Sequence, residues 1–223
     1  YLDATIIDAL GAEETRPRVT RVGDGLIVIL RGINTNAGED PEDMVSVRMW
    51  IDPQRIVSLS RRRVRAIERI AEATEAGQGP RDCAQFLTLL VEHLTQRIEG
   101  FWSGLEEQAD ALEENVLAGG GAEMRQQVVE LRRQAIILRR YLMPQRDALR
   151  GLQAAHPHWV EEDDLRHLAE ELDALERVVE DADAMRDRMA LVRDELASQL
   201  SDRLNRNMYL LSILSALFLP LGF

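Results

Sequence analysis

The sequence predicts an α+β fold: a small β-sheet covered by helices, followed by long antiparallel helices and a very long stalk helix. Three features lead to this prediction. Short alternating segments separated by turn residues occupy the N-terminal part, apolar residues recur with helical spacing after Arg61, and the stretch from Glu161 to Leu219 contains neither glycine nor proline. Since 45% of the residues are apolar, the chain can form a core for both parts.

The N-terminal segments predict the strands of one small sheet. Residues Val19 to Ile33 predict a β-hairpin whose turn lies at the Gly-Asp-Gly sequence of residues 23–25. Residues Val45 to Ile51 alternate between the two faces of a strand, and Ile56 to Leu59 follow a second turn signal, Asp-Pro-Gln. A sheet of four short strands needs helices over at least one of its faces.

Four helices are expected after the sheet, and glycine or proline residues mark most of their ends. Their predicted spans are Arg61–Ala76, Arg81–Leu117, Glu123–Gln153 and Glu161–Leu219. The last would be about 90 Å long, which is too long for a helix buried in a globular monomer. We therefore divide the chain into a sheet domain (1–78), a long helical hairpin (79–157) and a stalk helix that runs into a first transmembrane helix (158–223).

The C-terminal residues predict the beginning of a membrane helix. No charged residue occurs between Met208 and Phe223, and the run is apolar around the whole helix. A spanning helix needs about 20 such residues, so we expect the sequence to stop inside its first transmembrane helix. A helix buried in a protein core is the alternative. Because the sequence opens with Tyr1, we also expect the native N-terminus to lie upstream.

The composition of the sequence argues against several classes of function. The formal net charge of −12 argues against a nucleic-acid partner, because binding a phosphate backbone requires a basic surface. The single cysteine cannot form an intrachain disulfide, which favours a reducing compartment such as the cytoplasm. The sequence has no nucleophile–base pair, phosphate-binding loop or metalloprotease helix, so we expect neither an enzyme nor a bound cofactor.

Charge is distributed unevenly between two of the predicted helices. Residues 123–150 contain seven arginines and three acidic residues, whereas residues 161–206 contain seven arginines and 15 acidic residues. The third helix would therefore complement the long helix as an antiparallel neighbour. Solvated faces that only keep the protein soluble are an equally good interpretation.

Two stripes run along the predicted long helix. The first is apolar and should pack against other helices; it comprises Leu168, Leu172, Leu175, Val179, Ala182, Met185, Met189, Val192, Leu196, Leu200 and Leu204. The second advances by alternating steps of four and three residues and is acidic at one end and mostly small or polar toward the other. It comprises Asp187, Leu191, Asp194, Ser198, Ser201, Asn205, Met208, Ser212, Ser215 and Leu219.

The second stripe predicts the lining of a water-filled channel. Helices placed around an axis with this stripe inward would present the carboxylates of Asp187 and Asp194 to cations, and hydroxyl and amide oxygens to a partly hydrated ion. Met208 and Leu219 would form narrow hydrophobic rings. A solvated helix face that happens to carry aspartate and serine is the alternative interpretation.

Several stretches of the sequence are distinctive. They are residues 15–19 (TRPRV), 30–34 (LRGIN), 56–58 (IVS), 79–83 (GPRDC), 131–149 (LRRQAIILRRYLMPQRDAL) and 218–220 (FLP). The most specific is RRYLMPQR, residues 139–146. Together they resemble the ZntB zinc transporters of the CorA divalent-cation transporter superfamily, and the resemblance covers nearly the whole chain.

This resemblance implies a homopentamer with a funnel-shaped cytoplasmic domain in the bacterial inner membrane. The stalk helix would continue as the first membrane helix, contact lipid and line the pore at Asp194, Asn205, Met208 and Leu219. The resemblance also implies divalent metal ions as partners and Zn²⁺ as the transported ion. A Mg²⁺ channel of the same superfamily, or a membrane-anchored coiled-coil scaffold without transport activity, are the alternatives.

Other residues are weaker candidates for metal binding. His156 and His158 are spaced to hold a soft cation together with Glu161 or Glu162, although a solvated pair of loop residues has the same pattern. Cys83 would be a further ligand, or else a small buried residue at the start of a helix.

A group of four arginines follows the last predicted strand: Arg61, Arg62, Arg63 and Arg65. These residues would bind an anionic partner or lipid head groups. The alternative is a solvated cluster that pairs with nearby glutamates.

Overall fold

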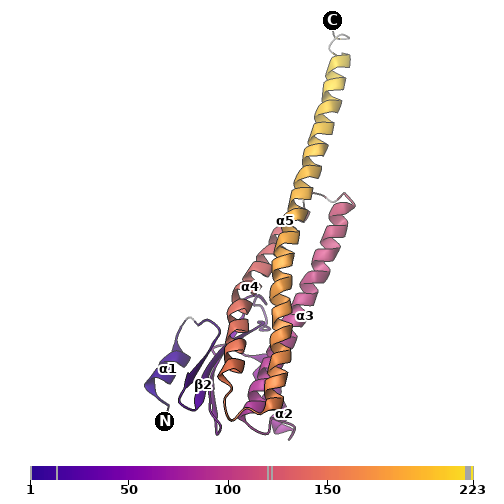
Figure 1. Cartoon of the computed structure of the whole chain (residues 1–223). Coiled ribbons are helices and arrows are strands. Elements are labelled where there is room, and N and C mark those ends of the chain that lie inside the picture. The colour runs from indigo at the N-terminus through magenta and orange to yellow at the C-terminus, as the bar shows by residue number, and fades with distance from the viewer. Residues whose placement is uncertain (1, 14, 120, 122, 219–221, 223) are drawn as a thin grey trace. The chain divides into compact units, whose positions relative to one another are not determined.

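The computed structural model describes residues 2–13, 15–119, 121, 123–218 and 222. Its elements are, in order, α1 (Ala4–Gly11), β1 (Arg18–Val22), β2 (Gly25–Gly32), β3 (Val45–Ile51), β4 (Ile56–Leu59), α2 (Arg65–Glu75), α3 (Cys83–Leu117), α4 (Met124–Ala155) and α5 (Glu162–Phe218). Figure 1 follows them by colour along the chain. This arrangement of a small sheet and long helices confirms the predicted α+β fold class.

The chain divides into two compact units. The first unit is formed by Tyr1–Gly104 and Ile136–Asp183, and the second unit by Leu105–Ala135 and Ala184–Phe223. Helices α3, α4 and α5 therefore each contribute to both units, whereas all four strands lie in the first unit. The division into three segments along the sequence stays a prediction.

The first unit contains an antiparallel sheet with the strand order β1-β2-β3-β4. Strands β1 and β2 form the expected hairpin, and Gly23 in its turn has a φ of 60°, a conformation that favours glycine. Strands β3 and β4 have the predicted bounds. The two central strands are almost completely buried, whereas most residues of the edge strands are exposed.

Helix α1 covers one face of this sheet and was not among the elements expected from the sequence. Its buried residues Ile6 and Leu10 form a cluster with Ile27, Ile29 and Trp50 of the central strands. The Thr5 backbone N–H donates to Asp3 Oδ1 at 2.8 Å and caps the helix. Because a helix of eight residues is marginal by itself, its packing on the sheet is what stabilises it.

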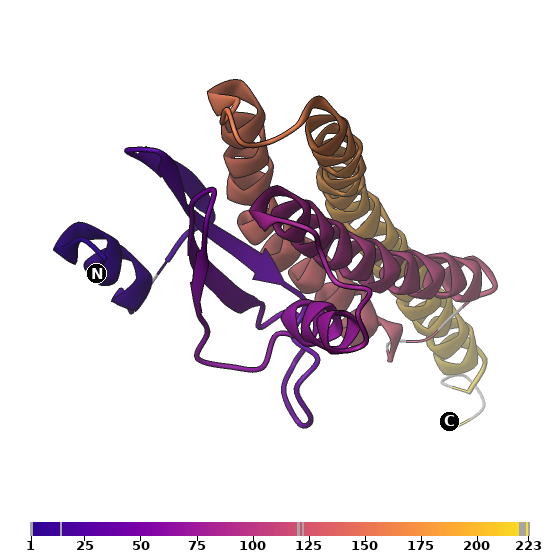
Figure 2. The same ribbon diagram turned by 90° about the horizontal axis from the view of Figure 1, so that it is seen from below.

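Segments of α3 and α4 cover the opposite face of the sheet, as Figure 2 shows. Completely buried leucines from these segments, among them Leu87, Leu90, Leu138 and Leu142, contribute to the core. The Arg31 backbone N–H also donates to Gln145 Oε1 at 2.6 Å, which joins the end of β2 to α4. The sheet is therefore covered on both faces within the first unit.

Helices α4 and α5 form ion pairs in the first unit. Arg150 lies 2.6 Å from Glu176, and Arg139 lies 2.7 Å from Asp183. These pairs agree with the predicted complementarity between the basic third helix and the acidic long helix. All four side chains are partly exposed, so each pair contributes at most about 1 kcal/mol.

Helix α2 begins at Arg65, whereas the sequence predicted a start at Arg61. Two side chains bind carbonyls of the intervening segment: Ser60 Oγ donates to the Arg62 carbonyl, and Asn36 Nδ2, from the connection between β2 and β3, donates to the Arg63 carbonyl. Val64 is extended, with φ −118° and ψ 105°, and directly precedes the helix. These contacts hold residues 61–63 outside the helix.

The second unit consists of the remaining parts of α3, α4 and α5. Its buried apolar residues come from all three helices: Leu105, Ala109, Leu112, Val116, Val128, Leu131, Ala135, Met185, Met189, Val192 and Leu196. Within the described ranges of the chain, no helix has an apolar stretch long enough to cross a membrane.

Candidate functional site

The candidate site is the side of α5 that lies opposite its buried seam in the second unit. The predicted apolar stripe is buried at every position from Leu168 to Leu196, whereas Leu200 is half-buried and Leu204 is 64% exposed. Every described residue of the second stripe is exposed: Asp187, Leu191, Asp194, Ser198, Ser201, Asn205, Met208, Ser212 and Ser215. At about 100° per residue, Asp187 and Asn205 project roughly 180° away from Leu196.

Three side chains anchor this part of α5 to α3 and to the turn that follows it. Arg188 donates to Asp110 Oδ1 at 2.6 Å and to Glu113 Oε2 at 2.5 Å. Gln199 Nε2 donates to the Val116 carbonyl at 3.1 Å, and Arg203 donates to the Gly119 carbonyl. All three anchors lie on the buried half of the helix by the same angular count. The second stripe therefore stays uncovered in a single chain.

The Arg188 contacts are charge-assisted. Burial disfavours its charge, but hydrogen bonds to Asp110 and Glu113 outweigh that effect and raise the pKa of Arg188 above its ordinary value. The guanidinium is therefore always charged and fixes the rotation of α5 about its own axis in this unit.

The two acidic members of the stripe have only local partners. Asp187 accepts a hydrogen bond from Arg186 at 2.9 Å, and Asp194 accepts one from Arg193 at 2.8 Å. Both carboxylates are well exposed, with 70% and 65% of the side-chain surface accessible, so these pairs are weak. Each carboxylate can therefore still approach a cation in water.

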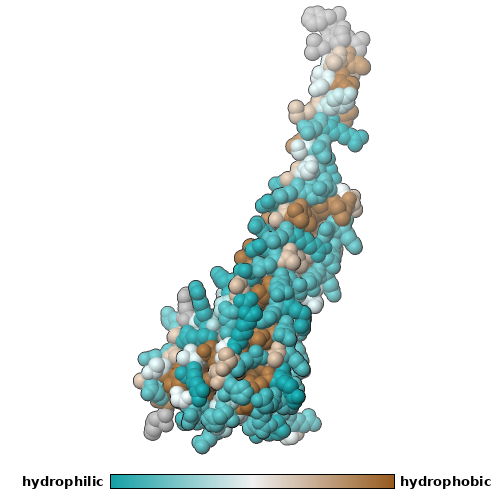
Figure 3. Space-filling view, viewed as in Figure 1, coloured by the Kyte–Doolittle hydropathy of each residue, from teal (hydrophilic) through white to brown (hydrophobic). Residues whose placement is uncertain are grey.

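The end of α5 carries apolar and polar groups that are all exposed. From Ser201 to Phe218 every side chain is exposed, and the large apolar ones are Leu204, Met208, Tyr209, Leu210, Leu211, Ile213, Leu214, Leu217 and Phe218. Figure 3 shows hydrophobic surface on this end of the helix. The Ser212 hydroxyl donates to the Met208 carbonyl at 2.9 Å, so it needs no other partner. Leu219, the last predicted pore residue, lies outside the described residues.

A comparison with known proteins identifies the family. The model of the CorA-like Mg²⁺ transporter protein family matches residues 2–223. The chain belongs to this family. Because this is a family of transporters, membership agrees with the prediction that the chain is not an enzyme.

Two curated relatives and one solved structure are similar to this CorA-family chain. The divalent cation transporter CmaX of Pseudomonas aeruginosa is 39% identical over 218 residues, which are 97% of this chain and 66% of that protein. The zinc transport protein ZntB of Pectobacterium carotovorum subsp. carotovorum is 37% identical over 219 residues, covering 98% of this chain and 67% of that protein. The chain thus spans about two thirds of the length of these relatives.

The solved structure is the ZntB cytoplasmic domain of Vibrio parahaemolyticus. It superimposes with a TM-score of 0.82 at 25% identity, over 91% of this chain and 80% of that one. This similarity confirms the predicted fold class and the resemblance to ZntB proteins.

The weaker metal candidates of this CorA-family chain are not brought together into a site. His156 Nε2 lies 3.3 Å from Glu162 Oε1, and His158 is exposed. Cys83 is half-buried at the start of α3, and burial raises the pKa of its thiol, which disfavours the metal-binding thiolate. Across the described part of the chain, no three His, Cys, Asp or Glu residues are grouped to hold a metal ion.

The residues that set the rotation of α5 were not predicted from the sequence. Arg188 and its partners Asp110 and Glu113 are 75 or more positions apart in sequence, so spacing on one helix does not reveal them. The only sequence signal is an arginine that directly follows the acidic stripe position Asp187 on the edge of the apolar seam. That position is equally compatible with a solvated arginine.

Proposed function

We propose that this chain is the cytoplasmic part of a bacterial inner-membrane transporter for divalent cations, with Zn²⁺ as the transported ion. Five copies would assemble around an axis, and the second stripe of α5 would line the pathway of the ion. The apolar end of α5 would continue into the membrane and contact lipid. Membership of a transporter family argues against a scaffold that has no transport role.

The observation that supports this proposal most is the geometry of α5 in the second unit. Its apolar seam is buried and its anchors lie on the same half of the helix, whereas Asp187, Asp194 and Asn205 are all exposed on the other half. In a symmetric assembly, one such face per copy can surround a common axis. Carboxylates around the axis would raise the local cation concentration, and amide and hydroxyl oxygens would replace part of the ion's hydration shell.

The proposal of Zn²⁺ as the transported ion rests on the names of similar proteins. ZntB proteins are named zinc transport proteins, which favours Zn²⁺, whereas the family description names Mg²⁺. Zn²⁺ accepts nitrogen, sulfur and oxygen ligands, and Mg²⁺ prefers oxygen ligands and keeps most of its water. The oxygen-rich stripe is compatible with both ions in hydrated form, so Mg²⁺ is the second candidate.

A transport assay with matched variants tests the proposal. The full-length protein is reconstituted in liposomes, and the uptake of Zn²⁺ and of Mg²⁺ is measured with ion-sensitive dyes. Asn205→Leu should slow uptake at least about tenfold, because a barrier higher by about 1.4 kcal/mol has that effect. Asn207→Leu is the control, since Asn207 is an exposed asparagine about 200° around the helix from Asn205.

Equal uptake by wild-type protein and Asn205→Leu would contradict the assignment of the pathway. Faster uptake of Mg²⁺ than of Zn²⁺ would change the cargo and leave the pathway intact. Absence of uptake of either ion by wild-type protein would contradict the proposed transport.

A further inference from the structure

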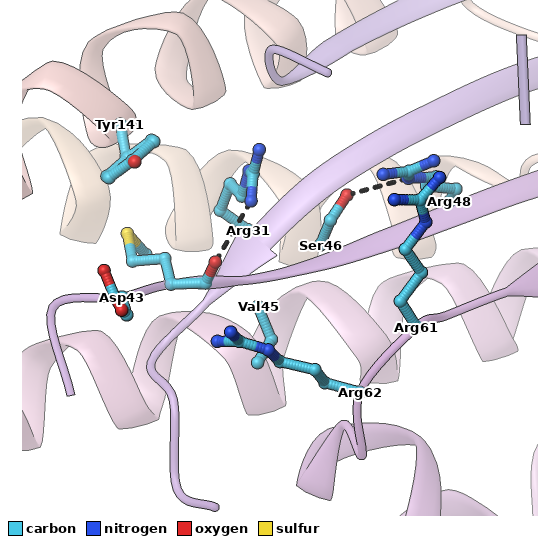
Figure 4. Close-up of a pocket in the computed structure, with 9 residues that line it drawn as sticks. Arg31, Asp43, Val45, Ser46, Arg48, Arg61, Arg62 and Tyr141 are labelled. Carbon is cyan, nitrogen blue, oxygen red and sulfur yellow. Dashed lines mark hydrogen bonds between the residues drawn. The ribbon is translucent and has the colours of Figure 1, made fainter. Parts of the chain in front are cut away.

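A cavity in the first unit is lined by four arginines. The register of the sheet places Arg31 opposite Ser46 and Arg48 opposite Ile29, on the sheet face that α1 partly covers. The cavity has a volume of about 280 Å³, and Arg61 and Arg62 line it from the segment after β4. Figure 4 shows these side chains around it, together with Asp43 and Tyr141.

Positive charge dominates the lining of this cavity. Four guanidinium groups face a single carboxylate, that of Asp43, which leaves an excess of three positive charges (four minus one) in a chain whose formal net charge is −12. A surface with the opposite sign to the whole protein needs a specific explanation. Structural ion pairs are the first possibility to examine.

The two inner arginines are held by neutral acceptors rather than by carboxylates. Arg31 donates to the Met44 carbonyl at 3.0 Å and to the Thr15 carbonyl at 2.7 Å, and its buried Nε has no partner among the described residues. Arg48 is 4% exposed and donates to Ser46 Oγ and to three backbone carbonyls that follow or end α1, those of Leu10, Ala12 and Glu13. These bonds position both guanidiniums, but none of them comes from a carboxylate among the residues that the structure describes.

The outer arginines differ from the rest of the arginine cluster after β4. Arg63 and Arg65 both pair with Glu68, and Arg62 pairs with Glu39 at 2.8 Å, as expected for a solvated cluster. In the described part of the chain, Arg61 forms no hydrogen bond or ion pair, although it lines the cavity. The interpretation of this cluster as a solvated group therefore explains three of its four arginines and not Arg61.

The like charges in the cavity repel one another. Burial lowers the pKa of Arg48, and the nearby charges of Arg61 and Arg31 lower it further. A bound anion would remove this repulsion and would accept hydrogen bonds from Arg61.

We propose that this cavity binds a small soluble anion through a phosphate group. A phosphate carries up to two negative charges and several acceptor oxygens, which matches the fork-shaped donors of arginine better than a single carboxylate does. Tyr141 also lines the cavity, and the Arg31 guanidinium lies 5.3 Å from the centre of its ring, which helps to position that arginine. The proposal concerns the first unit alone and does not depend on the ion pathway along α5.

The test is a titration of the full chain in metal-free buffer that contains a chelator, at constant ionic strength. Inorganic phosphate and phenyl phosphate are the two probes, with chloride as the reference, and binding is measured by calorimetry and by the shift in melting temperature. Arg61→Gln should weaken binding at least about tenfold, because a charge-assisted hydrogen bond is lost. This exposed residue has no contact that the fold requires, so the variant should melt like wild-type protein without ligand.

Arg63→Gln is the matched control, since it makes the same charge change two residues away at a side chain that is 85% exposed and outside this cavity. It should bind phosphate like wild-type protein. Tighter binding of phenyl phosphate than of inorganic phosphate would identify an organic phosphate as the ligand class, and equal binding would identify free phosphate. No binding of either probe at millimolar concentration, or equal weakening by Arg61→Gln and Arg63→Gln, would overturn the proposal.

Discussion

The two units of this chain differ in how much of their apolar surface is buried within a single chain. In the first unit, α1, α3 and α4 cover both faces of the sheet, and residues such as Leu142 and Val28 are completely buried. In the second unit, α5 has a buried seam only as far as Leu196, and from Ser201 to Phe218 every side chain is exposed. The first unit thus accounts for its own stability, whereas the end of α5 presents surface that a single chain does not use.

A matched pair of leucine substitutions should show the greatest difference between the units, measured as the free energy of unfolding. Leu142 is completely buried in the first unit, and Leu142→Ala should lower the free energy of unfolding by about 2–5 kcal/mol through lost burial and a new cavity. Leu211 is 63% exposed in α5, so Leu211→Ala should change it by less than about 0.5 kcal/mol. Urea denaturation of this chain measures both values, and equal losses would mean that α5 is covered in the isolated chain.

A smaller effect on stability comes from a buried carboxyl group of the first unit, that of Asp164. Asp164 is 5% exposed, and its Oδ2 has no hydrogen-bond partner among the described residues. Burial raises the pKa of Asp164 above its ordinary value of 3.8, and the negative charge of Asp82 raises it further. The folded protein therefore binds this proton more tightly than the unfolded chain does.

The sign of the pH dependence follows from that shift. The contribution of Asp164 to stability is complete below pH 3.8 and is lost as pH rises through the higher pKa of the folded state. Asp164→Asn should remove this loss, so its stability relative to wild-type protein should increase with pH, by up to about 1 kcal/mol. Denaturation between acid and neutral pH checks this prediction, and a pH-independent difference between Asp164→Asn and wild-type protein would contradict it.

Much of the fold was predictable because its signals are local. Turn residues and alternation give the bounds of β3 and β4, and a helical repeat gives the buried seam of α5 from Leu168 to Leu196. Helix α1 was not predictable in the same way. It is short and depends on burying Ile6 and Leu10 on strands that follow later in the sequence, a contact that spacing within α1 does not reveal.

The candidate site was predictable only in part, for a similar reason. The stripe through Asp187, Asp194 and Asn205 is a property of one helix, so its spacing alone predicts that these residues share a face. The anchoring of α5 by Arg188 and the arginine cavity around Arg31 both depend on residues far apart in sequence. The alternation of β3 places Arg48 on the same face as Ser46, opposite Val47 and Met49, so the sequence did not indicate that Arg48 would be buried.

The proximity of equivalent α5 residues in different copies tests most directly whether the polar stripe of α5 faces a common axis. In the full-length protein within its membrane, every native cysteine, Cys83 included, is replaced by serine, and one thiol is introduced by Asn205→Cys or by Asn207→Cys. A short bifunctional maleimide should link copies efficiently through residue 205, because that face would surround the common axis, and poorly through residue 207. Efficient linking through residue 207 with none through residue 205 would show that the polar stripe faces away from the axis and would contradict the account.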